Sequence, residues 1–415
     1  MKTNARFLKA CTVGATALGL LAARGAQAAW EYVPELSVLA ETTDNVLVDP
    51  DNEESASRTA LDLGVSLLNF TQRGELMVRP RLTSDYYLKS EHSDLETTDR
   101  YFDIRGNYEW QKIGLGFSTD YSNISALRAE LAGAAPVDPD VEGPVDVDTG
   151  RLSALNEKRR YLANRVNVDF NVSQRSTFGI ELRHADVSYS QQSAARDYRT
   201  DFNDTTVAVL LRRRTSQRNV ISARAFVSEY SAKATSNSTD SVGVAGEFTR
   251  PLTQTWTFDL SAGVQRSDFR FVNPETDEMV DNAETNFTFN MGFRKRGQRS
   301  LWNISANRSL DPNAAGHVVV RDQVRAFSQR QITPRLTSEF GVRWFSYEAL
   351  DKARSRGDRT YTRAELSFEY MMKRTLFVYF GVDVLRQKYE GEGTANSNGV
   401  FVGVSYRGLS RRDEL

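Results

Sequence analysis

The stretch AETNFTFNMGFRKRGQRSLWNISAN, residues 283–307, decides the fold. From Phe287 to Phe293 every second residue is apolar, and the residues between them are polar or glycine. The basic turn RKRGQR follows, and the alternation then resumes with Trp302, Ile304 and Ala306. Period two puts alternate side chains on opposite faces of a strand, so the pattern predicts a hairpin with one apolar and one polar face.

The same pattern recurs along the chain, from a first strand at Trp30 to Val46 to a last one ending at Tyr406. Alternation and turn residues indicate about eighteen strands, and an even number leaves both chain ends on one side of the membrane. We therefore predict an all-β fold, a transmembrane antiparallel β-barrel of about 18 strands. A secreted β-sandwich array and a β-helix are the alternatives. Sandwich strands are usually shorter and would not alternate short and long connections so regularly.

The composition is compatible with this barrel and excludes a helical membrane protein. The chain has 415 residues, a formal net charge of −1, 40% hydrophobic residues and a mean hydropathy of −0.49. After residue 28 no segment offers the ~20 consecutive apolar residues that a membrane-spanning helix needs. A barrel avoids that requirement because its lumen-facing side chains are polar.

Residues 1–28 have the three parts of a secretory signal peptide. Basic residues begin the segment, an apolar core runs from Cys11 to Ala23, and Ala26–Ala28 is a small-residue cleavage site. We expect cleavage near Ala28. Cys11 is the only cysteine, so the mature chain has neither a disulfide nor a thiolate metal site.

The remaining chain divides into a barrel over residues 29–408 and a periplasmic tail over residues 409–415. Two kinds of connection orient the barrel. The short ones are basic and rich in glutamine, as in Gln72–Arg73, Gln174–Arg175 and Gln217–Arg218. The longer ones are richer in acid, serine and glycine and cover residues 49–57, 128–156, 272–281 and 391–398. Short turns face the periplasm and longer loops face outside in barrels of this kind.

Aromatic residues predict the two membrane interfaces. Three tryptophans flank short turns, namely Trp110, Trp256 and Trp302. A second set of aromatics follows at a distance that matches the far interface of a tilted strand. This set contains Tyr86, Tyr121, Tyr189, Tyr230, Phe269, Tyr347 and Tyr389.

The polar faces of the strands carry charges of both signs, which predict the lumen lining. An arginine or lysine at the bilayer midplane costs about 2–4 kcal/mol on the lipid face, so these charges must face a wet interior. The candidate lumen-lining residues are Arg79, Arg81, Arg105, Arg165, Asp169, Glu181, Arg183, Glu284, Arg321, Arg325, Glu339, Arg343, Arg363, Glu365 and Asp383. Mixed signs are typical of a hydrated path for a polar or charged polymer, although cross-strand pairing explains many of them equally well.

No motif indicates catalysis, so we expect no enzyme, no catalytic residue, no metal site and no cofactor. The histidines His92, His184 and His317 lie far apart and lack a metal-ligand spacing. His184 has Asp186 and Ser188 nearby, which superficially resembles a hydrolase, but nothing else in the segment supports an activated serine.

The acidic segment from Arg128 to Asn156 allows three interpretations. A cation site is one, but the segment lacks the spacing of a known calcium loop. A constriction loop folded into the pore is the second. A solvated outer loop is the third and the one we favour.

The strand layout, the sequence Thr42-Thr43-Asp44-Asn45-Val46 and the repeated Gln-Arg turns resemble the second β-barrel porin family. Its members include EpsL-like outer-membrane proteins of exopolysaccharide and exosortase-associated operons. The resemblance implies an outer-membrane protein that gives a polysaccharide its way out, with a periplasmic polysaccharide-export protein as partner. One departure is that residues 407–415 follow Tyr406, where many outer-membrane barrels end on an aromatic residue.

The sequence thus predicts a barrel in the outer membrane of a Gram-negative bacterium that passes exopolysaccharide. A general diffusion porin for small polar solutes is the alternative. The expected partners are membrane lipid, the polysaccharide, the export protein and the barrel-assembly machinery, and no nucleic acid. A barrel that serves as an adhesin through its long loops is a further class.

Overall fold

The computed structural model describes residues 30–89, 93, 95–131, 157–190, 200–233, 237–272, 279–313, 318–350, 358–389 and 393–409. The predicted signal peptide, His92, His317, most of the 128–156 segment and the last six residues lie outside these ranges. No helix within them is long and apolar enough to cross a bilayer.

Strands make up nearly all of the described chain, which confirms the all-β prediction. The elements are β1 (Trp30–Thr43), β2 (Ala56–Phe70), β3 (Gly74–Tyr87), β4 (Thr97–Glu109), β5 (Ile113–Ser125), α2 (Ala126–Leu131), β6 (Lys158–Ser173), β7 (Ser176–Tyr189), β8 (Phe202–Arg214), β9 (Val220–Ala232), β10 (Ser238–Pro251), β11 (Trp256–Val272), β12 (Met279–Arg296), β13 (Ser300–Pro312), β14 (Val318–Thr333), β15 (Leu336–Ala349), β16 (Arg359–Lys373), β17 (Leu376–Tyr389) and β18 (Thr394–Arg407).

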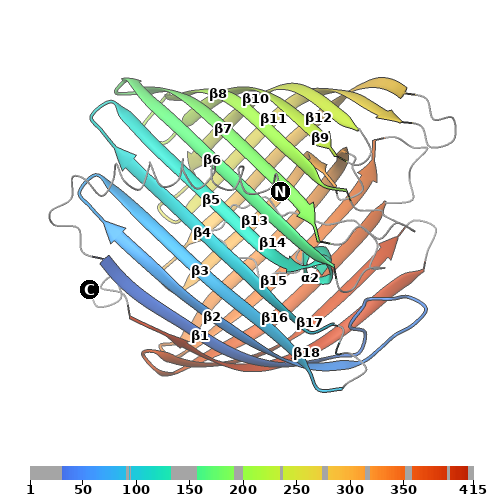
Figure 1. Ribbon diagram of the computed structural model, residues 1–415. Coiled ribbons are helices and arrows are strands. Elements are labelled where there is room, and N and C mark those ends of the chain that lie inside the picture. The colour runs from blue at the N-terminus through green and yellow to red at the C-terminus, as the bar shows by residue number, and fades with distance from the viewer. Residues whose placement is uncertain are drawn as a thin grey trace, which may run out of the picture.

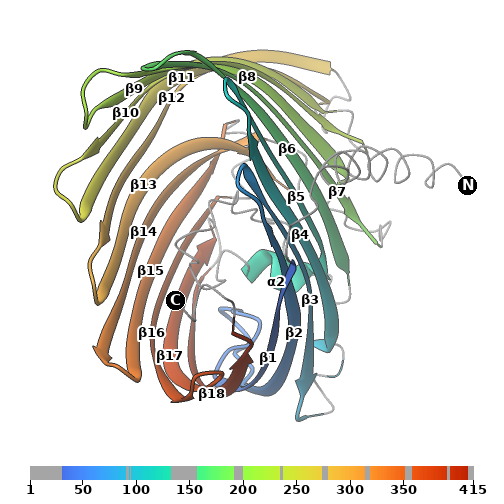
Figure 2. The same cartoon turned by 90° about the vertical axis from the view of Figure 1, so that its left-hand side faces the viewer.

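These strands form one 18-stranded sheet that closes on itself (Figures 1 and 2). Each strand pairs antiparallel with the next, and β1 pairs with both β2 and β18. Beyond the last β1–β18 pair, the Asp44 carboxylate accepts hydrogen bonds of 2.7 Å from the backbone N–H and the side-chain amide of Asn398. Burial alone would raise the pKa of Asp44, but these hydrogen bonds hold it below its usual value.

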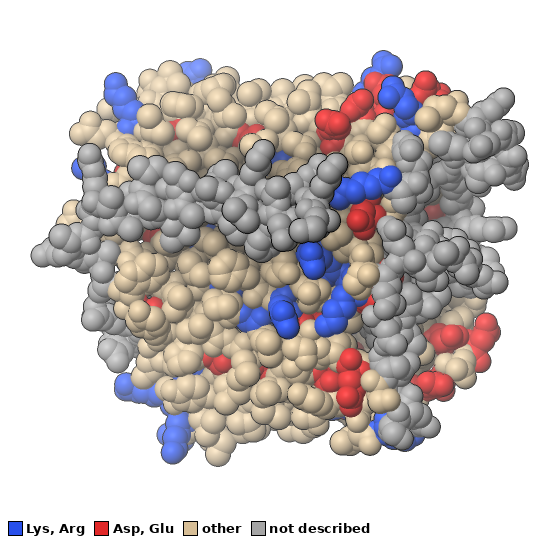
Figure 3. Space-filling model, viewed as in Figure 1, with Lys and Arg blue, Asp and Glu red and all other residues tan. Residues whose placement is uncertain are grey.

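The alternation in the sequence becomes an apolar outer face and a polar inner face. On β17 the outward side chains of Phe380, Val382 and Val384 are 46–49% exposed, whereas Asp383 is 9% and Gln387 1% exposed. On the face shown in Figure 3, the part toward the short turns, at the left, is largely uncharged except at its edge, and most charged side chains lie from the middle toward the long-loop end. An apolar outer face is the surface that a transmembrane barrel presents to lipid.

The connections alternate between short and long as predicted. Only Gln174 and Arg175 join β6 to β7, and only Arg374 and Thr375 join β16 to β17. The loop from β1 to β2, by contrast, covers residues 44–55. Both ends of the described chain lie at the end of the barrel that carries the short turns, because β1 starts there and β18 finishes there.

Part of the expected aromatic girdle is wrong. Trp110, Trp302 and Tyr86 are 41–53% exposed and lie on the outer face. Tyr189, Tyr230 and Tyr347, however, are only 3–8% exposed, because each lies an odd number of residues from the lipid-facing positions of its strand. They point inward and pack near the long-loop end of the lumen.

The longest gap in the pairing of the wall lies between β12 and β13. Their pairing covers only Phe289↔Arg308 to Arg296↔Leu301, so residues 279–288 of β12 pair with β11 alone. Unpaired backbone groups in lipid each cost several kcal/mol. Charged outward side chains on β11 lie beside the unpaired segment, among them Arg266 and Asp268, which are 62% and 59% exposed. The part of β12 beside these charges, residues 279–285, therefore extends beyond the lipid.

This interruption predicts an uneven pattern of hydrogen exchange along β12. In the protein reconstituted in lipid, amides of residues 279–288 that point away from β11 should exchange fast, because no strand accepts their hydrogen bonds. Amides of residues 289–296 should be protected. Uniform protection along the whole of β12 would contradict the interruption.

Candidate functional site

The inner wall of the barrel is the candidate functional site. All fifteen candidate residues lie on the side of their strands opposite to the exposed apolar side chains. They are Arg79 and Arg81 on β3, Arg105 on β4, Arg165 and Asp169 on β6, Glu181 and Arg183 on β7, Glu284 on β12, Arg321 and Arg325 on β14, Glu339 and Arg343 on β15, Arg363 and Glu365 on β16, and Asp383 on β17. They are therefore spread around the wall instead of converging on one point.

On the wall from β1 to β9, arginines pair with carboxylates of nearby strands. The distances between nitrogen and oxygen are 2.8 Å for Arg79–Glu35, 2.5 Å for Arg81–Asp62, 3.8 Å for Arg105–Asp120 and 3.9 Å for Arg212–Asp169. These pairs satisfy both charges and line the lumen with a balanced surface.

Glu181 connects three strands of this wall. Its carboxylate accepts hydrogen bonds from Arg165 on β6, at 2.6 Å, and from Arg224 on β9, at 3.3 Å. The residue is 8% exposed. Arg183, one step along the same inner face, lies directly opposite Arg165 in the β6–β7 register.

The wall from β13 to β17 has a different arrangement. Arg321 pairs with Asp311 at 3.0 Å, and Glu339 accepts a hydrogen bond from Gln329 at 2.8 Å. Arg363 contacts Glu365 at 3.2 Å and Asp383 at 3.5 Å. Arg325, Arg343 and Arg363 lie directly opposite one another on three successive strands.

Glu284 stands apart from these networks. It is exposed on the partly unpaired segment of β12, and it accepts a 3.5 Å hydrogen bond from the side-chain amide of Asn286. Its position on the inner face follows from the alternation, but the structure brings it to no arginine among the described residues.

Helix α2 narrows the long-loop end of the lumen. It follows β5, and its Arg128 reaches two inward-facing carboxylates, Asp85 on β3 and Asp99 on β4, the latter at 2.9 Å. Burial alone would lower the pKa of Arg128, but Tyr101 and these carboxylates raise it above its usual value. The first residues of the 128–156 segment therefore pack against the inner wall, which does not agree with a solvated outer loop there.

The loop after β1 also folds inward. The strand ends at Thr43 instead of Val46, because the side-chain amide of Asn45 donates to the carbonyls of Asp49, at 2.8 Å, and Asn396, at 3.0 Å. Val48 has a φ of 52°, an unfavourable conformation for a β-branched residue. It packs with inward-facing side chains of β14 to β18, namely Val319, Phe345, Tyr347, Tyr361, Leu385 and Ala395.

Two parts of the wall meet near this end. Val318, the first residue of β14, packs against an apolar cluster on β7, β8 and β9. That cluster contains Val187, Tyr189, Phe202, Tyr230 and Ala232. Together with α2 and the β1–β2 loop, this contact restricts the lumen at the long-loop end, while the inner wall nearer the short turns is lined by charge.

Sequence reasoning missed several partners of the candidate residues. Glu35, Asp62 and Arg224 complete ion pairs, and all three carry the signal of alternation because they lie opposite apolar neighbours. Arg128 carried no such signal, because it lies in a helix and its contacts depend on the path of the chain after β5.

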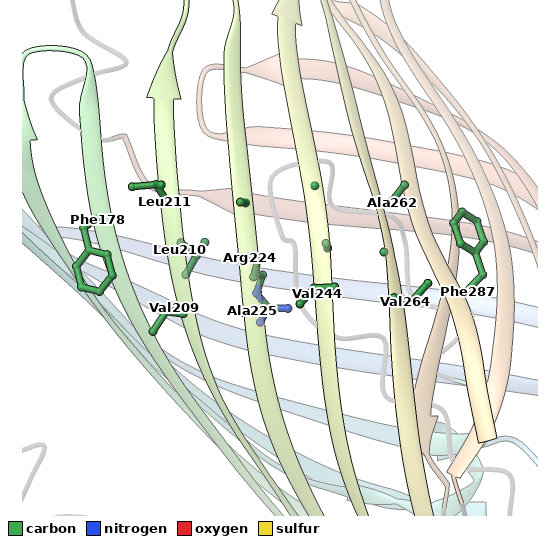
Figure 4. Close-up of a pocket in the computed structure, with 14 residues that line it drawn as sticks. Phe178, Val209, Leu210, Leu211, Arg224, Ala225, Val244, Ala262, Val264 and Phe287 are labelled. Carbon is green, nitrogen blue, oxygen red and sulfur yellow. The ribbon is translucent and has the colours of Figure 1, made fainter. Parts of the chain in front are cut away.

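An apolar groove of about 630 Å³ lies on the outer face, across β7 to β12 (Figure 4). Small side chains form its floor, including Ala225 and Ala262, and Phe178 and Phe287 lie at its two sides. Because it faces lipid, this groove has no part in a path through the lumen.

Two observations on the described residues concern metal binding and the segment around His184. They include no group of three or more His, Cys, Asp or Glu side chains that could bind a metal ion. The Nδ1 of His184 lies 2.8 Å from the Thr205 hydroxyl, and Asp186 pairs with Lys233 at 3.4 Å. The resemblance to a hydrolase around His184 therefore has no structural counterpart.

The closed ladder, the apolar outer face and the charged inner face define a transmembrane β-barrel. No protein-family model and no curated relative matches the sequence. Solved structures with similar architecture include the BenF-like porin from Pseudomonas fluorescens, with 10% identity and a TM-score of 0.46 over 91% of this chain and 98% of that one. OccAB2 from Acinetobacter baumannii has 10% identity and a TM-score of 0.45, over 91% and 98%.

The ferric citrate transporter FecA is also similar, with 10% identity and a TM-score of 0.44 over 88% of this chain. The chain spans 60% of the length of FecA. At these levels the similarities concern overall architecture and say nothing of what this chain carries.

Removing the Glu181 carboxylate should destabilise the barrel. Glu181→Ala leaves Arg165 and Arg224 without their shared acceptor, and we expect a loss of about 1–2 kcal/mol in the free energy of unfolding. The loss is smaller than for a fully buried pair because Arg165 is 52% exposed. Equilibrium unfolding in urea with lipid vesicles measures it. Glu284→Ala, which removes an exposed carboxylate, should change stability by less than about 0.5 kcal/mol, and equal losses would contradict the network.

Proposed function

We propose that this protein is a porin of the Gram-negative outer membrane that gives exopolysaccharide an aqueous passage. The observation that carries the proposal is the inner wall, where charges of both signs line a closed barrel of 18 strands. Barrels of 16–18 strands are wide enough for an aqueous channel unless loops fill them. The choice of exopolysaccharide as the solute rests on the resemblance of the sequence around Thr42–Val46 to EpsL-like proteins.

The orientation follows from the connections. Short turns lie at the end where β1 begins, and longer loops lie at the other end, so the polymer would enter at the short-turn end from the periplasm. A periplasmic polysaccharide-export protein is the proposed partner at that entrance, and the barrel-assembly machinery is the proposed partner in insertion. The proposed route needs no cofactor and no nucleic acid.

A general diffusion porin for small polar solutes is the second candidate. The restricted long-loop end favours it, because α2, Val48 and the contact of Val318 leave less room there than a wide channel has. A polymer passes such a restriction only as a single extended chain or after the loops move.

Deleting the gene should abolish or strongly reduce the surface polysaccharide, because the polymer then lacks its passage through the outer membrane. Quantitative staining of surface polymer measures the effect. Expression of the intact chain from a plasmid should restore it, which controls for neighbouring genes.

Normal polymer output after the deletion would contradict export. If the purified barrel then also admits small sugars in liposome-swelling assays, the diffusion porin is the better account.

A further inference from the structure

The inner wall contains a row of three arginines, of which Arg363 pairs with Glu365 and Asp383. Arg325 on β14 lies directly opposite Arg343 on β15, which lies directly opposite Arg363 on β16. Cross-strand neighbours on one face have Cβ atoms about 4.5–5.5 Å apart, and like charges in these positions destabilise the sheet. We call these three residues the arginine row.

Arg325 is the least satisfied member of the arginine row. It forms no ion pair with a carboxylate in the described parts of the chain, and its Nε is buried without a hydrogen-bond acceptor there. Its neighbour on the other side, Ser305 of β13, brings a hydroxyl and no charge. On the opposite wall, by contrast, arginines such as Arg79 and Arg81 have carboxylate partners.

The surroundings of the arginine row strengthen its field. Arg343 is 6% exposed, and the next residues toward the long-loop end, Phe345 and Tyr361, are fully buried and stacked with ring centres 4.6 Å apart. A low local dielectric increases both the repulsion between the guanidinium groups and their attraction for an anion. Arg325 and Arg363 are both partly exposed toward the lumen, so a solute can reach them.

From this geometry we propose that the arginine row binds an anionic group, a carboxylate or a phosphate, on the solute that traverses the lumen. Guanidinium groups bind both anions through paired N–H donors. The bound anion would relieve the repulsion within the row. The inference deepens the proposed function, since it makes the polymer an acidic one, and to that extent it rests on that function.

Calorimetric titration of the purified barrel in detergent tests the site without requiring transport. The probes are trigalacturonate for an acidic polymer, maltotriose as its neutral counterpart, and inorganic phosphate for a small free anion. Trigalacturonate should bind, and more weakly at higher salt, whereas maltotriose should not. Arg325→Gln should weaken trigalacturonate binding at least about tenfold, as expected for the loss of a hydrogen bond to a charged group.

Arg308→Gln is the matched control. It removes the same charge from β13, but Arg308 faces outward and pairs with Asp322 at 3.6 Å. The affinity of Arg308→Gln for trigalacturonate should stay within about twofold of that of the wild type. Because Arg325→Gln removes repulsion, its thermal stability should equal or exceed that of the wild type.

The proposal is overturned if the wild type binds neither anion, or if both variants lose binding equally. A large loss of stability in Arg325→Gln would also overturn it, since Arg325 would then be structural. Binding of phosphate but not of trigalacturonate supports the anion site and assigns it to a small solute. Unchanged polymer output in the deletion strain, with binding intact, contradicts export and leaves the anion site standing.

Discussion

The structure depends on one constraint, which is that every backbone hydrogen-bonding group within a bilayer must find its partner inside the protein. A closed antiparallel ladder satisfies it, and here β1 completes the ring by pairing with β18. The same ladder fixes the direction of each side chain, so one residue in two faces lipid and the next faces the lumen. The longest gap in this pairing, between β12 and β13, lies mostly beside charged outward residues of β11.

Inside the ring, the balance of charge differs between two parts of the wall. From β1 to β9, arginines and carboxylates neutralise each other across strands, as Glu181 does for Arg165 and Arg224. From β14 to β16, the register brings three arginines into one row. Such a charged inner surface is unfavourable for lipid and compatible with a polar solute. On β14 to β16 it attracts negative charge.

Alternation in the sequence was sufficient to predict the closed barrel and its strand number, because period two is a local property of a strand. Alternation does not show which residues are neighbours across strands. Which residue lies opposite Arg343, or that Glu35 meets Arg79, depends on register, and register depends on the whole ladder. Its distance from the short turn places Tyr347 at the far interface, but its odd position on β15 turns the side chain inward. The inward path of the β1–β2 loop depends on hydrogen bonds of Asn45 that no periodicity encodes.

The most direct test of this account uses spin labels on single cysteines at successive positions of β17, from Val378 to Leu385, in lipid vesicles. The only natural cysteine, Cys11, lies in the predicted signal peptide, so the mature chain needs no prior substitution. Collision rates with oxygen, which dissolves in lipid, and with a water-soluble nickel complex report the surroundings of each label. The account predicts strict alternation, with oxygen favoured at Val378, Phe380, Val382 and Val384 and nickel at the positions between them. Equal access of the nickel complex to all positions would contradict it.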